Sequence, residues 1–142
     1  MKKLSLLLAV LFISSAMFAQ SYDGKGDKKI NFGYEFYGFG NGVTASFDYG
    51  ISDLFSVGLG GSYYFSNDDN DYYIFARTAI HLGELLDFNE KFDIYPGVDI
   101  GYLQRNDIGF GGYLGFRFFF TESFGIFAEF GNTGKAGLSF TF

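Results

Sequence analysis

The chain has 142 residues, the size of a single domain. Aromatic residues make up 23% of it, Gly and Phe each occur 21 times, and Pro occurs once, a composition that favours strands and turns over helices. Because Cys is absent, disulfides, thiolate metal sites, cysteine nucleophiles and cysteine lipidation are excluded. The net charge of −6 argues against nucleic-acid binding, which needs a basic face.

The first residues have the pattern of a secretory signal peptide. Lys2 and Lys3 form a basic start, residues 4–13 an apolar run, and residues 14–19 lead to a cleavage site before Gln20. The alternative, a transmembrane anchor, would need about 20 apolar residues, and the run is shorter. We therefore predict a cleaved signal peptide at 1–19, a short polar segment at 20–28 and one domain at 29–142. Cleavage would leave a net charge of −8 and would place the protein outside the cytoplasm.

From residue 29 onward, apolar residues alternate with small or polar ones, which is the two-residue period of β-strands. Most of the predicted strands are close to the length of about 9–11 residues that crosses a membrane when tilted. The eight predicted strands are 29–38, 43–51, 56–65, 72–82, 92–102, 108–120, 124–131 and 135–142. Pro96 falls inside the fifth strand and lacks a backbone donor, so a bulge or a local break is predicted there.

The two faces of these strands differ in an unusual way. In strand 108–120, Phe110 and Phe118 lie on one face, and Gly111 and Arg117 lie on the other. A soluble sandwich would expose the polar face, but here that face is rich in glycine and carries few charges. Both faces are accounted for if the large apolar residues contact lipid and the small and polar residues fill a narrow lumen. Since a sheet in hydrocarbon must leave no backbone donor unpaired, we predict an all-β fold, an eight-stranded antiparallel transmembrane β-barrel with up-and-down order.

The last predicted strand runs to the final residue, with Leu138, Phe140 and Phe142 on its apolar face. A closed barrel explains this ending, because the edge of the strand would pair with the first strand and its apolar face would contact lipid. An even number of strands also puts both termini on one side, the periplasm. Candidates for an aromatic girdle beside the outer loops are Tyr63, Tyr72 and Tyr102.

Four stretches carry a resemblance to a known group of proteins. They are "YGISDLFSVGLGGSYYF", "KFDIYPGVDIGY", "GGYLGFRFFFTESFGIFAEFG" and "KAGLSFTF". The chain resembles the small eight-stranded outer-membrane barrels of the OmpA-transmembrane and OmpX-like group, and is most similar to the compact barrels of Bacteroidetes-type bacteria. The resemblance covers residues 20–142 and implies a multi-pass, monomeric barrel in the bacterial outer membrane, in contact with lipid and lipopolysaccharide. It also implies that the barrel-insertion machinery reads Leu138, Phe140 and Phe142 as an assembly signal.

The predicted lumen contains a set of ionisable side chains. They are Glu35, Asp48, Arg77, His81, Asp93, Asp99, Arg117 and Glu129. An unpaired charge in a narrow lumen is costly, so we expect Arg77 and Arg117 to pair with neighbouring carboxylates and to plug the barrel. The alternative is a gated ion path in which one arginine exchanges carboxylate partners, although eight strands leave an interior that side chains can just fill.

Two features suggest chemistry without a matching motif. His81 is the only histidine, and a hydrolase would pair it with a serine and an acid. Lipid A deacylases of this barrel class place their Ser and His on the outward face, whereas His81 is predicted to face the lumen. The loop "SNDDND" contains Asp68, Asp69 and Asp71, a weak candidate for a divalent cation, because the Gly and Glu of an EF-hand are missing.

We therefore predict a non-enzymatic integral outer-membrane barrel without a cofactor, whose filled lumen serves a structural or envelope role. Two alternatives remain open. One is a surface module that binds ions or an extracellular partner through its acidic loops. The other is a narrow ion pore. The fold itself hosts adhesins, enzymes, pores and structural proteins, so it does not choose among these roles.

Overall fold

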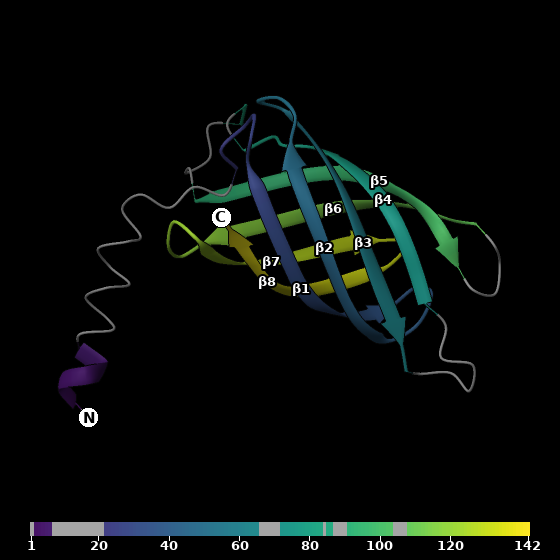
Figure 1. Ribbon diagram of the computed structural model, residues 1–142, viewed down its shortest axis with the longest axis horizontal. Coiled ribbons are helices and arrows are strands. Elements are labelled where there is room, and N and C mark those ends of the chain that lie inside the picture. The colour runs from purple at the N-terminus through teal and green to yellow at the C-terminus, as the bar shows by residue number, and fades with distance from the viewer. Residues whose placement is uncertain (1, 7–21, 66–71, 84, 87–90, 104–107) are drawn as a thin grey trace.

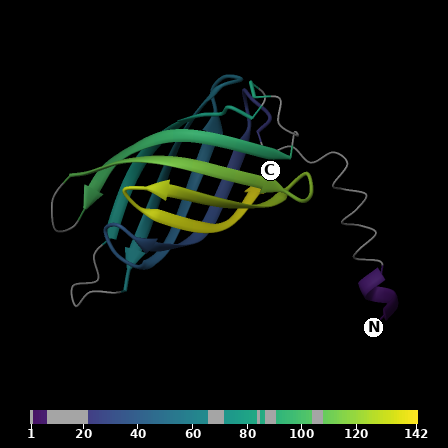
Figure 2. The same cartoon turned by 180° about the vertical axis from the view of Figure 1, so that it is seen from behind.

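The computed structural model describes residues 2–6, 22–65, 72–83, 85–86, 91–103 and 108–142. Eight antiparallel strands follow one another in chain order and close into a barrel, with β8 beside β1 (Figures 1 and 2). The strands are β1 (Lys28–Tyr37), β2 (Gly42–Gly50), β3 (Phe55–Tyr64), β4 (Tyr72–Ile80), β5 (Phe92–Leu103), β6 (Gly109–Phe119), β7 (Phe124–Gly131) and β8 (Gly134–Thr141). The predicted number of strands, their order and the closure are confirmed.

Both ends of the barrel domain lie at the same mouth. Lys29 of β1 pairs with Thr141 of β8, so the entry to the first strand and the exit from the last are neighbours. We call this the terminal mouth, and it also carries the turns after β2, β4 and β6. The opposite end, which carries the turns after β1, β3, β5 and β7, is the far mouth (Figure 1).

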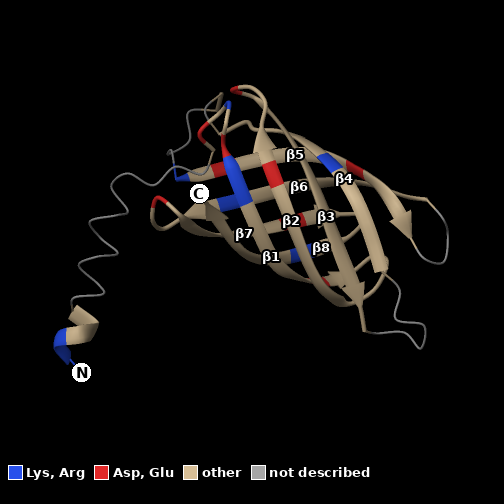
Figure 3. Ribbon diagram, in the orientation of Figure 1, with Lys and Arg blue, Asp and Glu red and all other residues tan. Residues whose placement is uncertain are grey.

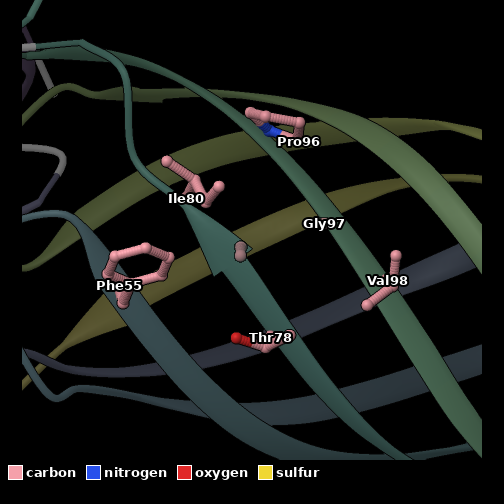
Figure 4. Close-up of a pocket in the computed structure, with 7 residues that line it drawn as sticks. Phe55, Thr78, Ile80, Pro96, Gly97 and Val98 are labelled. Atoms are coloured by element: carbon pink, nitrogen blue, oxygen red, sulfur yellow. The ribbon is translucent and has the colours of Figure 1, made fainter.

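Pro96 interrupts the ladder on one side of β5. The strand continues through Pro96, which pairs with Leu114 of β6, and no register shift occurs there. On the other side the ladder with β4 ends at Ala79 and Gly97. The predicted local break is thus confined to the β4 side. A shallow apolar groove lies on the outer face of the wall at this point, and Figure 4 shows its lining residues Phe55, Thr78, Ile80, Pro96, Gly97 and Val98.

The outer wall of the barrel is covered by large apolar side chains. Leu59 is 68% exposed, Phe110 64% and Ile74 61%, although all three lie within strands. Every second residue of a strand points the same way, so each of these positions is flanked by inward-facing neighbours. A water-soluble protein rarely leaves so continuous an apolar surface uncovered.

Glycines on the inner face make room for aromatic rings. A Cβ atom on Gly115 would collide with the ring of Tyr95, and one on Gly97 would collide with the ring of Tyr113. In both cases the glycine and the tyrosine are direct register partners on β5 and β6. Each ring therefore occupies the space beside a glycine of the adjacent strand.

Some sequence-based predictions fall outside the described residues. The cleavage site before Gln20 lies in the segment 7–21, and Asp68, Asp69 and Asp71 lie in the segment 66–71. Both remain predictions. Among the described residues, no helix is long and apolar enough to cross a membrane.

Candidate functional site

The structure places the predicted lumen residues inside the barrel, each with at most 9% of its surface exposed. They are Glu35 on β1, Asp48 on β2, Arg77 on β4, His81 directly after β4, Asp93 and Asp99 on β5, Arg117 on β6 and Glu129 on β7. Figure 3 shows that basic and acidic residues occur along several strands of the wall. The barrel interior is therefore ionic over much of its length.

Arg77, Asp48, Glu129 and Arg117 form a central ion network. Arg77 donates two hydrogen bonds to the carboxylate of Glu129, at 3.1 and 2.7 Å. Its Nε atom lies 3.2 Å from Asp48 Oδ1, and Arg117 Nη2 lies 3.5 Å from Asp48 Oδ2. Asp48 thus bridges the two guanidinium groups. Arginine and carboxylate planes suit this paired geometry, which holds both partners in fixed orientations.

The arginines reach across the lumen and not only along the sheet. Asp99 is the register partner of Arg77, yet Arg77 is bidentate to Glu129 on β7. In the same way Asp93 is the register partner of Arg117, yet Arg117 contacts Asp48 on β2. These contacts tie opposite walls of the barrel together.

Two tyrosines extend the central ion network. The guanidinium of Arg77 lies 4.6 Å from the ring centre of Tyr113, and that of Arg117 lies 4.5 Å from the ring centre of Tyr95. A cation over an aromatic face is attracted by the ring quadrupole. The hydroxyl of Tyr95 also donates to Glu129 at 2.9 Å. The network is therefore packed as well as hydrogen-bonded.

Asn31 and Ser139 complete the network on the β1 and β8 side. Asn31 donates to Asp48 at 2.8 Å and accepts hydrogen bonds from Ser139 at 2.7 Å and from Arg117 at 3.3 Å. Both residues are at most 2% exposed. They were missed as site residues because they carry no charge, although Asn31 is four residues from Glu35 in the predicted strand 29–38 and so shares its face.

Near the far mouth the lumen is filled mainly by aromatic residues. This far-mouth cluster consists of Phe39, Tyr64, Tyr73, Phe75 and Leu103. Its two phenols reach carboxylates that the predicted set included. Tyr73 donates to Asp99 at 2.6 Å, and Tyr64 donates to Glu35 at 3.1 Å. Each of these two buried acids is thus partnered by a phenol.

Two buried lysines were absent from the predicted set. Lys135 is the register partner of both Glu35 and Glu129, and its ammonium lies 4.8 Å from the ring centre of Phe75. Lys29 forms an ion pair with Asp27 at the terminal mouth. Lysine side chains are mostly exposed, above all near a strand end, so alternation alone did not predict that these two lysines are buried.

At the terminal mouth, Ser56, His81 and Asp93 form a hydrogen-bonded chain, which we call the mouth triad. Ser56 Oγ lies 2.7 Å from His81 Nε2, and His81 Nδ1 lies 2.5 Å from Asp93 Oδ2. The second oxygen of Asp93 accepts a hydrogen bond from the backbone N–H of Gly83 at 3.0 Å. Burial lowers the pKa of His81, while the Asp93 carboxylate opposes that effect. The sequence predicted that His81 faces the lumen, but it did not predict the contact between His81 and Ser56.

A short segment before β1 lies across the terminal mouth and over the triad. The ring of Tyr22 stacks on His81 with centroids 3.6 Å apart, and its hydroxyl donates to the carbonyls of Ser52 and Phe55 at 2.6 and 2.7 Å. Gly26 N–H donates to Gly50 at 2.7 Å, which fixes the segment to the end of β2. Burial raises the pKa of the Tyr22 phenol, so it stays a neutral donor.

No group of three or more His, Asp or Glu side chains within the described ranges is arranged to hold a metal ion. The described site is instead a sequence of three levels along the lumen: the mouth triad, the central ion network and the far-mouth cluster. Such an arrangement ties the strands to one another through contacts between their inward side chains.

Comparison with known proteins supports the fold and identifies the family. The barrel is similar to a de novo designed transmembrane β-barrel, with a TM-score of 0.66 and 13% identity over 85% of this chain and 100% of the other. It is also similar to the N-terminal β-barrel domain of Pseudomonas aeruginosa OprF, with a TM-score of 0.64 and 17% identity over 84% of this chain and 100% of the other. No curated protein has significant sequence similarity to the chain. Residues 10–134 match the sequence pattern of DUF6646, and the chain belongs to this family of unknown function.

Proposed function

We propose that this protein is an integral barrel of the bacterial outer membrane, with a structural role in the envelope. The observation that carries the proposal is the reversed polarity of the fold. Arg117 and Glu129 are each 1% exposed inside the barrel, whereas Leu59 is 68% exposed outside it. Hydrocarbon around the wall makes this distribution favourable, and the closed sheet leaves no strand edge to be satisfied there.

Aromatic residues at the two ends of the outer wall support a membrane position. Near the terminal mouth, ring contacts join Phe118 to Phe120, Phe120 to Phe124 and Phe124 to Phe140. Near the far mouth the outward rings include both tyrosines and phenylalanines, among them Tyr34, Tyr63, Tyr102, Phe36 and Phe65. Two aromatic girdles that border a more aliphatic band are typical of membrane barrels. In the proposed orientation the far mouth faces outward and both termini are periplasmic, as in the compact barrels of Bacteroidetes-type bacteria.

The last strand is the proposed signal for membrane insertion. Leu138 of β8 is 42% exposed, and Phe142, directly after this strand, is 67% exposed. Phe140 lies between them at the same two-residue spacing. The strand also closes the barrel against β1. The proposed partners are therefore the barrel-insertion machinery, which would read this strand, and the lipid and lipopolysaccharide around the wall. The protein is proposed to act as a monomer.

Heat-modifiable gel migration tests this function. A folded outer-membrane barrel resists detergent and migrates at a different position until it is boiled. We expect the purified chain to fold only after detergent or lipid is added, and then to shift on boiling. A chain that folds fully in plain buffer and shows no shift would contradict the proposal.

One observation favours a second function, a narrow ion path. Asp48 contacts both Arg77 and Arg117, so one guanidinium could leave while the other keeps the carboxylate paired. Recordings in planar bilayers should compare the native barrel with the double variant Arg77→Ala, Arg117→Ala. A purely structural barrel conducts little in both forms if the other side chains still fill the lumen. Discrete channel events in the native protein that disappear or change in the variant would favour the ion path.

A further inference from the structure

The mouth triad has the atomic order of a serine nucleophile and its base. Ser56 lies on β3, His81 directly follows β4, and Asp93 lies on β5, so three adjacent strands bring the residues together. The Ser56 hydroxyl can donate to Nε2 of His81 only if Nδ1 carries the ring proton. Asp93 Oδ2, 2.5 Å from Nδ1, accepts a hydrogen bond from this N–H and thereby selects the tautomer. The same division of roles activates serine in many unrelated hydrolases.

The surroundings of His81 keep the ring in a form that can accept a proton. The ring is buried, which favours the neutral imidazole. The positive charges of Arg117 and Lys29 favour it as well. Asp93 favours the charged form, and the aromatic rings of Tyr22 and Tyr95 pack beside the imidazole. A neutral base near physiological pH suits proton removal from a hydroxyl. The nearby positive charges would also help the imidazolium to release its proton afterwards.

The cover over the triad comes from a part of the chain that can be displaced without opening the barrel. Tyr22 precedes β1 and takes no part in the strand ladder. Its ring stacks on His81, and its hydroxyl donates to the carbonyls of Ser52 and of Phe55 at the start of β3. Ser56 itself is 4% exposed beneath it. Movement of Tyr22 would open the triad to the terminal mouth while the strand ladder stays intact.

We propose that Ser56 is a reactive nucleophile that accepts an acyl group from a small activated ester entering through the terminal mouth. In this step Ser56 Oγ forms a bond to the ester carbonyl carbon and gives its proton to His81 Nε2. The bond between that carbon and the leaving oxygen then breaks, and His81 returns the proton to the departing alcohol. Asp93 is a positioning residue that holds the imidazole. This single transfer goes beyond the structural role proposed above and does not depend on it.

A fluorophosphonate probe tests the nucleophile directly in the refolded barrel. Ser56 Oγ would displace fluoride from phosphorus, and intact-mass and peptide analysis would locate the adduct. We expect labelling at Ser56, none in Ser56→Ala, and normal labelling in Ser62→Ala. Ser62 is the matched control because it is also a buried serine of β3, but it donates to Thr44 at 2.9 Å. His81→Gln should slow labelling by about 100-fold or more, the usual contribution of a general base, and Tyr22→Ala should accelerate it.

A thiol variant provides a second measurement that does not depend on the size of the probe. The chain has no Cys, so Ser56→Cys introduces a single thiol. We expect iodoacetamide to alkylate it faster than the thiol of Ser62→Cys, with a pH midpoint below the ordinary thiol value of about 8.5. His81→Gln should abolish this shift, and Asp93→Asn should reduce it. A merely structural triad would not move the pH profile.

The proposal fails on either of two results obtained with folded barrels, checked by their heat-modifiable migration. The first is an absence of phosphonate on Ser56 in both the native chain and Tyr22→Ala. The second is a Ser56→Cys thiol that reacts no faster than the Ser62→Cys thiol and whose pH profile is the same with and without His81→Gln.

Discussion

The central ion network and the far-mouth cluster fill the same lumen in different ways. The network holds Arg77 by two carboxylates at defined distances, so removal of Arg77 deprives two buried carboxylates of a guanidinium partner. The far-mouth cluster is held by ring packing, with single hydrogen bonds from Tyr64 and Tyr73 to Glu35 and Asp99. Substitutions there should cost in proportion to the volume or the hydrogen bond removed. The middle of the barrel should thus respond to mutation more abruptly than its far end.

The largest effect is expected for Arg77→Ala. This change leaves the buried carboxylates of Asp48 and Glu129 without their shared guanidinium, which should lower the free energy of unfolding by about 3–5 kcal/mol. Urea unfolding in lipid vesicles measures this loss of stability. Lys25→Ala, at an exposed position, controls for the loss of a positive charge. A loss below about 1 kcal/mol would show that the network contributes little.

The second-largest effect is expected for Phe75→Ala, which removes a ring from the far-mouth cluster. The ring is 2% exposed and contacts Tyr73 at a centroid distance of 5.1 Å. Its removal should cost about 3 kcal/mol, the lower end for a buried Phe, because water can enter from the mouth. Phe75→Leu keeps most of the side-chain volume and should cost less than Phe75→Ala in the same unfolding assay. Equal losses for the two variants would contradict a packing role.

A smaller effect is expected for Tyr73→Phe, which removes only the hydroxyl that bonds to Asp99. A hydrogen bond to a charged group is worth about 1.5–3 kcal/mol, and the variant should lose an amount in that range. The adjacent Tyr72→Phe is the matched control, because that ring lies on the outer wall. If both variants unfold at the same urea concentration, the phenol does not stabilise the buried carboxylate.

The smallest effect concerns pH at the terminal mouth. The pKa of His81 is lowered from 6.5 by burial, so the unfolded chain takes up a proton more readily than the folded barrel. Its contribution to stability is therefore present above pH 6.5 and is lost as the pH falls through the folded value. His81→Gln should make the urea midpoint depend less on pH between about 7.5 and 5. An unchanged slope would mean that His81 does not titrate with unfolding.

Alternation along the strands predicted the barrel because each side chain's face depends only on its position in the strand. The sequence of "IGFGGYLGFRFFF" alone separates Phe116 and Phe118 from Gly115 and Arg117. It also identified most of the charged residues that the structure places inside, although not Lys29 and Lys135. Strand ends differ from the predicted ones by two residues or fewer, for example Ile80 in place of Leu82 at the end of β4.

The pairing inside the lumen could not be read in the same way. Partners such as Arg77 and Glu129 lie on β4 and β7, and their meeting depends on the stagger of the strands around the closed barrel. The mouth triad was missed for a related reason, since Ser56 is one of many serines until the register brings it to His81. Tyr22 lies before the first strand, where alternation provides no information.

The central claim is that the outer wall contacts acyl chains while the charges remain inside. The chain has no Trp, so a single introduced tryptophan reports on one position. Leu59→Trp lies on the outer wall and Phe127→Trp inside the lumen, where the native ring is 4% exposed. In vesicles of lipids brominated along their acyl chains, we predict strong quenching of Leu59→Trp and weak quenching of Phe127→Trp. Equal quenching at both positions, or a chain that stays folded and monomeric in buffer with Leu59→Trp unquenched, would contradict the account.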